Sequence, residues 1–231
     1  MVAQKKYIKN IPAIIWGEES NKVFLFVHGK LSSKESAAQL AEMAEKKGYQ
    51  TISFDLPEHG ERKEEHIRCD IFQGMKELKE MEAYILKNWE EVSLYACSLG
   101  AYFSLQTYQN DKFKQCLFQS PILNMEYLIQ QMFHAYGVSE SMLKEKKEIP
   151  TPVDILSWDY YTFVKSNPIE KWNTQTSILY GLKDNLQSYE VINNFTTKIQ
   201  ADLTISKESE HAFMSEKDTC IVEKWLSSHI K

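Results

Sequence analysis

The stretch LYACSLGAYFS, residues 94–104, runs from an apolar segment directly into a serine that has a small residue two places to either side. Ala96 and Gly100 stand symmetrically about Ser98. A tight turn that holds one side chain in a strained conformation needs this symmetry, because a bulky flanking group would collide with the neighbouring backbone. We therefore predict that Ser98 lies on such a turn, between a strand and the helix that follows it.

Segments typical of buried strands alternate along the chain with segments of helical periodicity. The predicted strands span residues 22–29, 49–57, 91–97, 114–121, 176–182 and 201–206. The predicted helices span residues 33–48, 70–89, 99–108, 188–199 and 215–230, and residues 5–20 predict an antiparallel hairpin at one edge. Ser33 is the expected N-cap of the first helix, and Gly48 is expected to end it. This alternation predicts an α/β fold with a doubly wound, mostly parallel sheet that has helices on both faces.

Residues 122–174 interrupt the alternation with a connection much longer than those that usually join neighbouring elements. They include a helical piece at residues 125–137 and the aromatic cluster SWDYYTFV at residues 157–164. So many aromatic residues are not typical of a disordered segment. We therefore predict a single domain, residues 1–231, in which residues 122–174 form a helical cap over the carboxyl edge of the sheet.

Composition excludes several classes of protein. Of the 231 residues, 27 are Lys or Arg and 32 are Asp or Glu, which gives a formal net charge of −5. This mildly acidic mixture lacks the basic surface that binds nucleic acids and anionic membranes. No apolar run is long enough for a membrane span, and the start MVAQKKYIKN lacks the apolar core of a signal peptide. The four cysteines have no paired spacing, which favours reduced thiols in a cytoplasmic protein.

A neutral serine is a poor nucleophile, so catalysis at Ser98 needs a base, an acid that orients the base, and donors for the oxyanion. In a doubly wound sheet these groups come from loops at the carboxyl edge of the strands. Asp184 follows the strand at 176–182, His211 follows the strand at 201–206, and the segment VHGK closes the first strand. The sequence thus places a candidate acid, a candidate base and candidate backbone donors at the same edge as Ser98.

The segment ACSLG, residues 96–100, resembles the small-x-Ser-x-small pentapeptide of the α/β-hydrolase family, with Ala96 where Gly is usual. The HG pair at residues 28–29 and the segment FDLPEHGER at residues 54–62 resemble two further loops of that family. The order serine, aspartate, histidine along the chain also matches. The resemblance covers nearly the whole chain and implies the α/β-hydrolase fold.

The resemblance also implies a serine hydrolase that needs no metal or other cofactor and has a small-molecule ester as its partner. It assigns Ser98 as the nucleophile, His211 as the base and Asp184 as the orienting acid. It assigns the backbone N–H groups of Lys30 and Leu99 as the oxyanion hole.

Within the family, an aromatic cap at this place in the chain is most similar to the branch of carboxylesterases, monoacylglycerol lipases and feruloyl esterases. This similarity implies hydrolysis of a carboxylic ester through an acyl-enzyme, with Phe133, Trp158 and Tyr161 of the cap as substrate contacts. Because little of the chain remains to build a deep tunnel, we expect short to medium acyl chains. The same residues also suit an acyltransferase, a thioesterase, a peptidase or a ligand-binding protein without catalysis.

Each candidate residue also has a purely structural interpretation. Ser98 could simply cap a helix, and Cys97 is best explained as a small buried residue. Asp184 could be a turn residue, with Asp154 and Glu208 as rival acids.

Other polar groups have less specific patterns. His59, His66 and Cys69 lack the paired spacing of a zinc site, so no metal is expected. His28 is expected to support the backbone of its loop rather than to act as a base. The side chain of Lys30 would favour an acidic group on the substrate if it pointed into the pocket.

Overall fold

The computed structural model describes residues 1–110 and 112–231, and within them eight strands form one sheet in the order β1-β2-β4-β3-β5-β6-β9-β10. The strands are β1 Ala3–Ile8, β2 Ile11–Trp16, β3 Lys22–Val27, β4 Gln50–Phe54, β5 Glu91–Cys97, β6 Cys116–Gln119, β9 Thr176–Gly181 and β10 Asp202–Ser206. The β1–β2 hairpin is antiparallel and joins β4 in antiparallel register, whereas every other neighbouring pair is parallel. The predicted mostly parallel sheet with an edge hairpin is confirmed.

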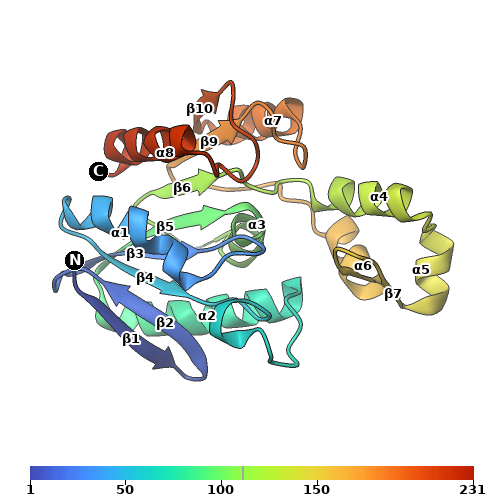
Figure 1. Ribbon diagram of the computed structural model, residues 1–231, viewed down its shortest axis with the longest axis horizontal. Helices are drawn as coiled ribbons and strands as arrows, with labels where there is room; N and C mark the ends of the chain where they lie inside the picture. Colours follow the sequence, from blue (N-terminus) through green and yellow to red (C-terminus); the bar gives the residue numbers. More distant parts are fainter. Residues whose placement is uncertain (111) are drawn as a thin grey trace.

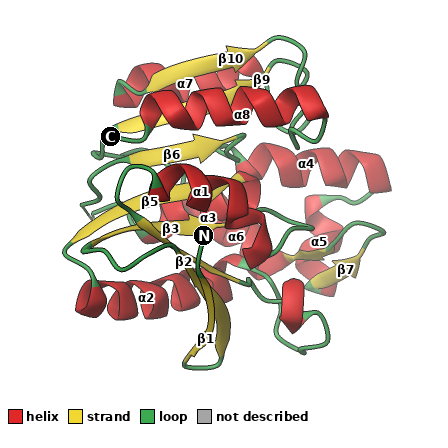
Figure 2. Ribbon diagram, turned by 60° about the vertical axis from the view of Figure 1, so that its left-hand side comes forward, coloured by secondary structure: helices red, strands yellow, loops and turns green. Residues whose placement is uncertain are grey.

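Helices cover both faces of this sheet (Figure 2). Helices α1 (Ala38–Glu45) and α8 (Glu216–His229) pack on one face, and α2 (Ile71–Asn88), α3 (Ser98–Thr107) and α7 (Tyr189–Ile199) pack on the other. Successive side chains of a strand point to opposite faces. In β3, Phe24 therefore joins the core beneath α1 and α8, while its neighbour Leu25 joins the core beneath α2 and α3. Both faces are apolar because both are covered.

The helix expected at residues 33–48 begins differently from the prediction. A 3-10 turn, η1 (Lys34–Ala37), precedes α1, and the Ser33 side chain makes no capping hydrogen bond. Asp55 takes that role from outside the helix, because its carboxylate accepts the backbone N–H of Lys34 at 2.8 Å and the Lys34 ammonium at 2.7 Å. Helix α1 ends at Glu45 with Lys46 as its C-cap, before the expected end at Gly48, which has φ of +79° in the turn that follows.

Helix α2 continues through Gly74, whose presence in a helix interior normally costs stability. The reason is the close approach of α3. A Cβ atom on Gly74 would lie 2.5 Å from the ring of Phe103, which is fully buried. Gly74 therefore lets two helices approach each other on the same face of the sheet.

Residues 122–174, which we call the insertion, connect β6 to β9. They form α4 (Met125–Tyr136), α5 (Glu140–Lys146), the antiparallel hairpin β7 (Glu148–Pro150) and β8 (Ile155–Ser157), and α6 (Trp158–Ser166). The insertion projects from the side of the core toward which β5 and β6 point, that is, from the carboxyl edge of the sheet (Figure 1). The sequence did not predict the hairpin, whose strands have only three residues each.

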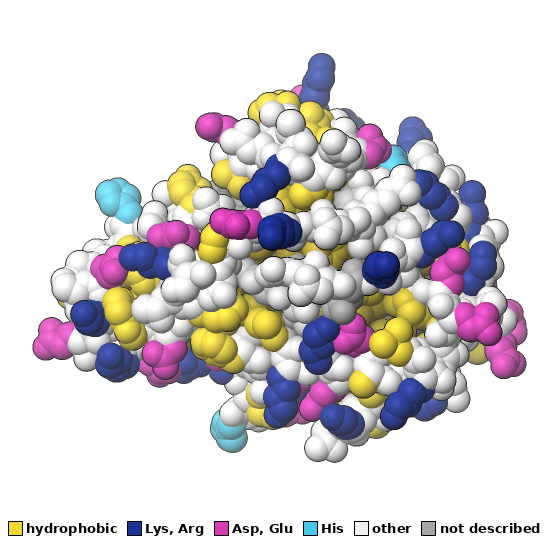
Figure 3. All heavy atoms as spheres, turned by 180° about the vertical axis from the view of Figure 1, so that it is seen from behind, with side chains coloured by type: hydrophobic (Ala, Val, Ile, Leu, Met, Phe, Trp, Pro, Cys, Tyr) yellow, Lys and Arg dark blue, Asp and Glu magenta, His cyan; other side chains and the backbone are white. Residues whose placement is uncertain are grey.

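The surface carries both signs of charge. Lys and Arg side chains are interspersed with Asp and Glu over the face shown in Figure 3. Among the helices of residues 1–110 and 112–231, none combines the length and the apolar character that crossing a membrane requires.

Candidate active site

Ser98 occupies the strained turn that the sequence predicts. Strand β5 ends at Cys97, α3 begins at Ser98, and Ser98 has φ of +48°, a left-handed conformation that residues other than glycine rarely adopt. A Cβ atom on Gly100 would lie 2.4 Å from the carbonyl oxygen of His28, and a Cβ atom on Gly29 would lie 3.0 Å from the Cβ of Ser98. The small residues are needed because the loop after β3 passes directly against this turn.

The structure brings Ser98, His211 and Asp184 together in one hydrogen-bonded chain. The Nε2 atom of His211 lies 2.8 Å from the Ser98 hydroxyl oxygen, and its Nδ1 atom lies 2.7 Å from Oδ2 of Asp184. The side chain of Asp184 is fully buried, and its Oδ1 atom accepts the backbone N–H groups of Leu186 at 2.7 Å and Gln187 at 3.1 Å. With Nδ1–H donated to the carboxylate, Nε2 is free to accept the serine proton.

The loops that carry Asp184 and His211 lie backbone to backbone. Lys183 donates its backbone N–H to the carbonyl of Ser209 at 3.0 Å, and Leu182 donates to the carbonyl of Ser206 at 2.8 Å. A Cβ atom on Gly181 would lie 2.4 Å from the same Ser209 carbonyl. Glycine at the end of β9 therefore permits the contact that sets the distance between the acid and the base.

Asp218 holds the far end of the His211 loop. Its carboxylate accepts the hydroxyl of Ser209 and the backbone N–H of Ser215, the latter at 2.9 Å, and together with the Ser215 hydroxyl it forms a capping box at the start of α8. The bonds from Ser209 and then Ser215 hold the pKa of Asp218 below its usual value. The loop is thus fixed at both ends, on either side of His211.

The loop after β3, residues 28–33, which we call the β3 loop, starts at a buried histidine. The Nε2 atom of His28 accepts the backbone N–H of Leu56 at 3.0 Å, so Nδ1–H donates to the carbonyl of Gly29 at 2.7 Å. Burial lowers the pKa of His28 to about 4, which keeps the ring neutral. His28 supports its own loop through the bond to Gly29, and it also joins this loop to the one after β4 through the bond to Leu56, which the sequence did not predict.

Two backbone N–H groups, those of Leu99 and Lys30, have no hydrogen-bond partner among the described residues and are available to a ligand. The N–H of Leu99 lies in the first turn of α3, where helical N–H groups have no partner within the helix. The N–H of Lys30 makes no hydrogen bond with any residue that the structure describes. These are the two donors that the sequence analysis selected.

The ammonium of Lys30 is already paired within the protein. This corrects the expectation that it would favour an acidic group on the substrate if it pointed into the pocket. The ammonium donates to the carboxylate of Asp154 and, at 2.9 Å, to the carbonyl of Val153. A positive charge neutralised in this way gives no preference for an acidic substrate. The two rivals for the orienting acid have other partners. Asp154 pairs with Lys30, and Glu208 pairs with Lys183 at 2.6 Å.

The three aromatic residues predicted to contact substrate pack on one another. Phe133 of α4 lies 4.9 Å from Tyr161 of α6, and Trp158 lies 6.2 Å from Tyr161, measured between ring centroids. Phe133 and Tyr161 are 8% and 2% exposed. They belong to the apolar core that the insertion shares with one face of the sheet, and their contact with substrate stays a prediction.

Sequence reasoning missed two apolar residues beside the site. Leu31 is 93% exposed and directly follows Lys30, while Met214 is 85% exposed and lies three residues after His211. Large apolar side chains at such exposure, in loops at the carboxyl edge, are candidates for contact with a substrate. The available signal was their position one and three residues after the site residues Lys30 and His211, in segments without the periodicity of a strand or helix.

A cavity of about 380 Å³ lies at the base of the insertion. Its walls include Tyr102 of α3, Leu123 at the start of the insertion, Val164 of α6 and Phe195 of α7. Tyr102 lies one helical turn beyond Ser98. The residues of the hydrogen-bonded chain, Ser98, His211 and Asp184, do not line this cavity. Nor do the predicted substrate contacts Phe133, Trp158 and Tyr161.

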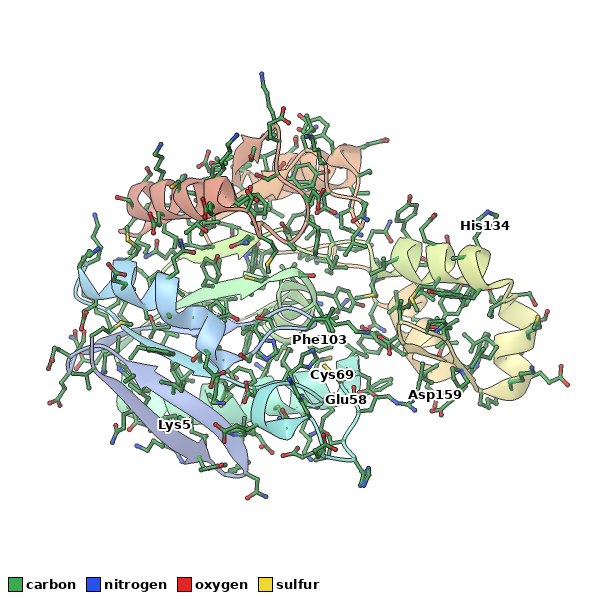
Figure 4. All side chains as sticks on the ribbon, viewed as in Figure 1. Lys5, Glu58, Cys69, Phe103, His134 and Asp159 are labelled. Carbon is green, nitrogen blue, oxygen red and sulfur yellow. The ribbon has the colours of Figure 1, made fainter. Side chains whose placement is uncertain are left out.

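Two cysteines near the site, Cys97 and Cys69, are poorly suited to act as nucleophiles. Burial raises the pKa of Cys97 and of Cys69 to about 12, so both thiols stay protonated near neutral pH. Glu58 and Cys69 lie on the part of the core nearest the insertion, whereas His134 lies on the outer side of α4 (Figure 4). Within the described residues, no group of three His, Cys, Asp or Glu side chains is placed to hold a metal ion.

No family model matches the sequence, and no curated protein matches it. Solved structures match along the whole chain. A hydrolase from Agrobacterium vitis S4 has 15% sequence identity and a TM-score of 0.79, with 100% of this chain and 99% of that chain covered. Est1E from Butyrivibrio proteoclasticus with bound ferulic acid has 16% identity and a TM-score of 0.77, with 98% and 97% covered.

A monoacylglycerol lipase from Paleococcus ferrophilus has 18% identity and a TM-score of 0.68, with 95% of this chain and 99% of that chain covered. Identities this low establish the fold and leave activity to be argued from the site. The chain has the α/β-hydrolase fold.

Proposed function

We propose that the protein is a serine hydrolase that cleaves a carboxylic ester of short to medium acyl chain through an acyl-enzyme. The observation that carries the proposal is the chain of contacts from Ser98 through His211 to Asp184, at 2.8 and 2.7 Å. A serine in a strained turn, a base within reach of its hydroxyl and a buried carboxylate on the far side of that base are the parts that nucleophilic catalysis needs.

In the first half of the reaction, the hydroxyl of Ser98 attacks the ester carbonyl carbon while Nε2 of His211 accepts its proton. Asp184 keeps the proton of the imidazole on Nδ1 and stabilises the positive charge that develops on the ring. The N–H groups of Lys30 and Leu99 donate to the oxyanion. His211 then gives its proton to the departing alcohol, which leaves Ser98 acylated.

In the second half, His211 removes a proton from water, and the resulting hydroxide attacks the acyl carbonyl. The same two N–H groups stabilise the second tetrahedral intermediate. Its collapse breaks the bond between the acyl carbon and the Ser98 oxygen, which takes the proton from His211, and the carboxylic acid leaves. No step requires a metal or an organic cofactor. Transfer to an alcohol or amine in place of water would use the same residues, and competing acceptors in a product analysis separate the two outcomes.

The experiment compares Ser98→Ala with Cys97→Ala. We expect Ser98→Ala to lose at least about 10³-fold in kcat on p-nitrophenyl butyrate, because both halves of the reaction pass through the serine oxygen. Cys97→Ala removes the neighbouring thiol and should keep most of the turnover. A Ser98→Ala protein that folds and keeps turnover near that of the wild type would show that the nucleophile lies elsewhere.

A further inference from the structure

At the tip of the β3 loop, residues 30–32, the backbone makes no hydrogen bond within the part of the chain that the structure describes. Hydrogen bonds hold the loop at its two ends, where His28 bonds to Gly29 and Leu56, and where Lys34 bonds to Asp55. Between these ends, the backbone groups of residues 30–32 make no hydrogen bond with any described residue. Leu31 adds no packing either, because it is 93% exposed, and its φ of +63° is a strained conformation.

One side chain links this tip to a distant part of the molecule. The ammonium of Lys30 bonds to the carboxylate of Asp154 and to the carbonyl of Val153 in the insertion. The other side-chain bond of the tip is local, since the hydroxyl of Ser32 bonds to that of Ser36 at 2.6 Å. The insertion therefore holds the tip through Lys30.

Asp154 is itself held by its own turn. Its Oδ1 atom accepts the backbone N–H of Ile155 at 2.8 Å, which leaves Oδ2 for Lys30. Its carbonyl accepts the backbone N–H and the hydroxyl of Thr151, at 2.8 and 2.6 Å. The turn between β7 and β8 thus offers Lys30 an acceptor in a fixed position.

We propose that Asp154 is a positioning residue for the oxyanion hole. This inference rests on the proposed function, in which the N–H of Lys30 is one of the two oxyanion donors. An oxyanion donor is effective only when it lies about 2.7–3.1 Å from the developing charge. By holding the side chain of Lys30, Asp154 holds the N–H of the same residue, and the insertion takes part in catalysis through this contact.

A contact of this kind affects catalysis more than stability. The side chains of Lys30 and Asp154 are 42% and 51% exposed, and ion pairs at such exposure contribute little to the free energy of unfolding. Catalysis depends steeply on the position of each group. We therefore expect variants of this pair to fold normally and to turn over substrate slowly.

The test uses Asp154→Asn, Lys30→Met and the double variant with p-nitrophenyl butyrate. Asp154→Asn keeps an acceptor for the N–H of Ile155, and Lys30→Met keeps the backbone N–H. Since complete loss of one oxyanion donor costs roughly 10²–10³-fold, we expect a misplaced donor to lower kcat by about tenfold with KM nearly unchanged. The double variant should be no slower than either single variant, because both changes break the same contact.

The ion pair between Arg68 and Glu148 provides a matched control. It ties the same hairpin to the core at 2.6 and 3.1 Å, and its side chains are 32% and 52% exposed, but neither residue adjoins an oxyanion donor. Glu148→Gln should therefore leave kcat unchanged. Wild-type kcat should fall as salt screens the Lys30–Asp154 pair, and Lys30→Met should lose that dependence.

Two results would overturn the inference: kcat of Asp154→Asn equal to that of the wild type, or an equal fall in kcat for Glu148→Gln. The second would mean that the pair merely keeps the insertion in place. Labelling with a fluorophosphonate separates this failure from failure of the proposed function. If wild type is labelled at Ser98 and Asp154→Asn turns over normally, only the role of Asp154 is wrong; if wild type is not labelled, the proposed function is wrong.

Discussion

At the scale of single residues, the pentapeptide and the order of the polar residues were enough to select Ser98, Asp184 and His211. The role of Gly100 also followed from the sequence, and the structure gives its reason in the 2.4 Å approach to the His28 carbonyl. The sequence did not predict the partner of the Lys30 side chain. It is Asp154, 124 residues away, and no local pattern links the two positions.

The buried ring of His28 makes the stability of the fold depend on pH. Its pKa is about 4 in the folded protein and 6.5 in the unfolded chain, so between these values the unfolded chain binds the extra proton. The neutral His28 ring therefore costs no stability above pH 6.5, where both states are unprotonated. The free energy of unfolding falls as the pH drops from 6.5 toward 4, and below pH 4 this residue causes no further change. Between pH 6.5 and pH 4.5 the loss should be about 2–3 kcal/mol.

Urea unfolding at pH 6.5 and pH 4.5 measures this loss. Other groups titrate in the same range, so the comparison is with His28→Gln, which is less stable at pH 6.5 but has no ring to protonate. We expect the wild type to lose more stability than His28→Gln over this interval. Equal losses would show that His28 does not cause the pH dependence.

At the scale of elements, apolar periodicity located the strands of the sheet and the helices α2, α3, α7 and α8. These elements have clear patterns because each presents an apolar face to a covered sheet. The start of α1 was predicted wrongly, since a carboxylate from another loop, Asp55, replaces the expected cap. The β7–β8 hairpin was missed because strands of three residues carry too few side chains to show a period of two.

The packing of α2 against α3 predicts the effect of Gly74→Ala. In an exposed helix this change would raise stability by about 1 kcal/mol. Here the added methyl group would meet the ring of Phe103 at 2.5 Å in a fully buried place. We expect a loss of about 1–3 kcal/mol in the free energy of unfolding, measured with urea. The double variant with Phe103→Leu should recover part of it, and a stabilising Gly74→Ala would refute the close approach.

At the scale of the whole molecule, the topology alone predicted that three loops far apart in the chain meet at the carboxyl edge. Parallel strands end on the same side of a sheet, so residues that follow them converge. The way the insertion meets the core could not be predicted, because it depends on single contacts such as Lys30 with Asp154 and Arg68 with Glu148. Phe133, Trp158 and Tyr161 of the insertion pack on one another, an arrangement that no local pattern in the sequence indicates, and their contact with substrate stays a prediction.

The arrangement of the insertion bears on the chain length of the substrate. Its aromatic rings pack on one another and, through Phe163 against Phe72 of α2, on the core, so we expect room for a short to medium acyl chain and no long tunnel. Each methylene that is buried should raise kcat/KM roughly fourfold, from about 0.8 kcal/mol of transfer free energy. Across p-nitrophenyl esters from acetate to palmitate, kcat/KM should rise over the first few members and then fall. A profile that still rises at palmitate would contradict this expectation.

The most direct test of the central claim is the mass of a trapped adduct. The wild-type protein is treated with a fluorophosphonate and digested, and the peptide that carries the phosphonyl group is sequenced by mass spectrometry. We predict one phosphonyl group per chain, bound to the oxygen of Ser98, and none on a Ser98→Ala protein. A modified residue other than Ser98, or a folded wild-type protein that is hydrolytically active and stays unlabelled, would contradict the assignment of Ser98 as the nucleophile.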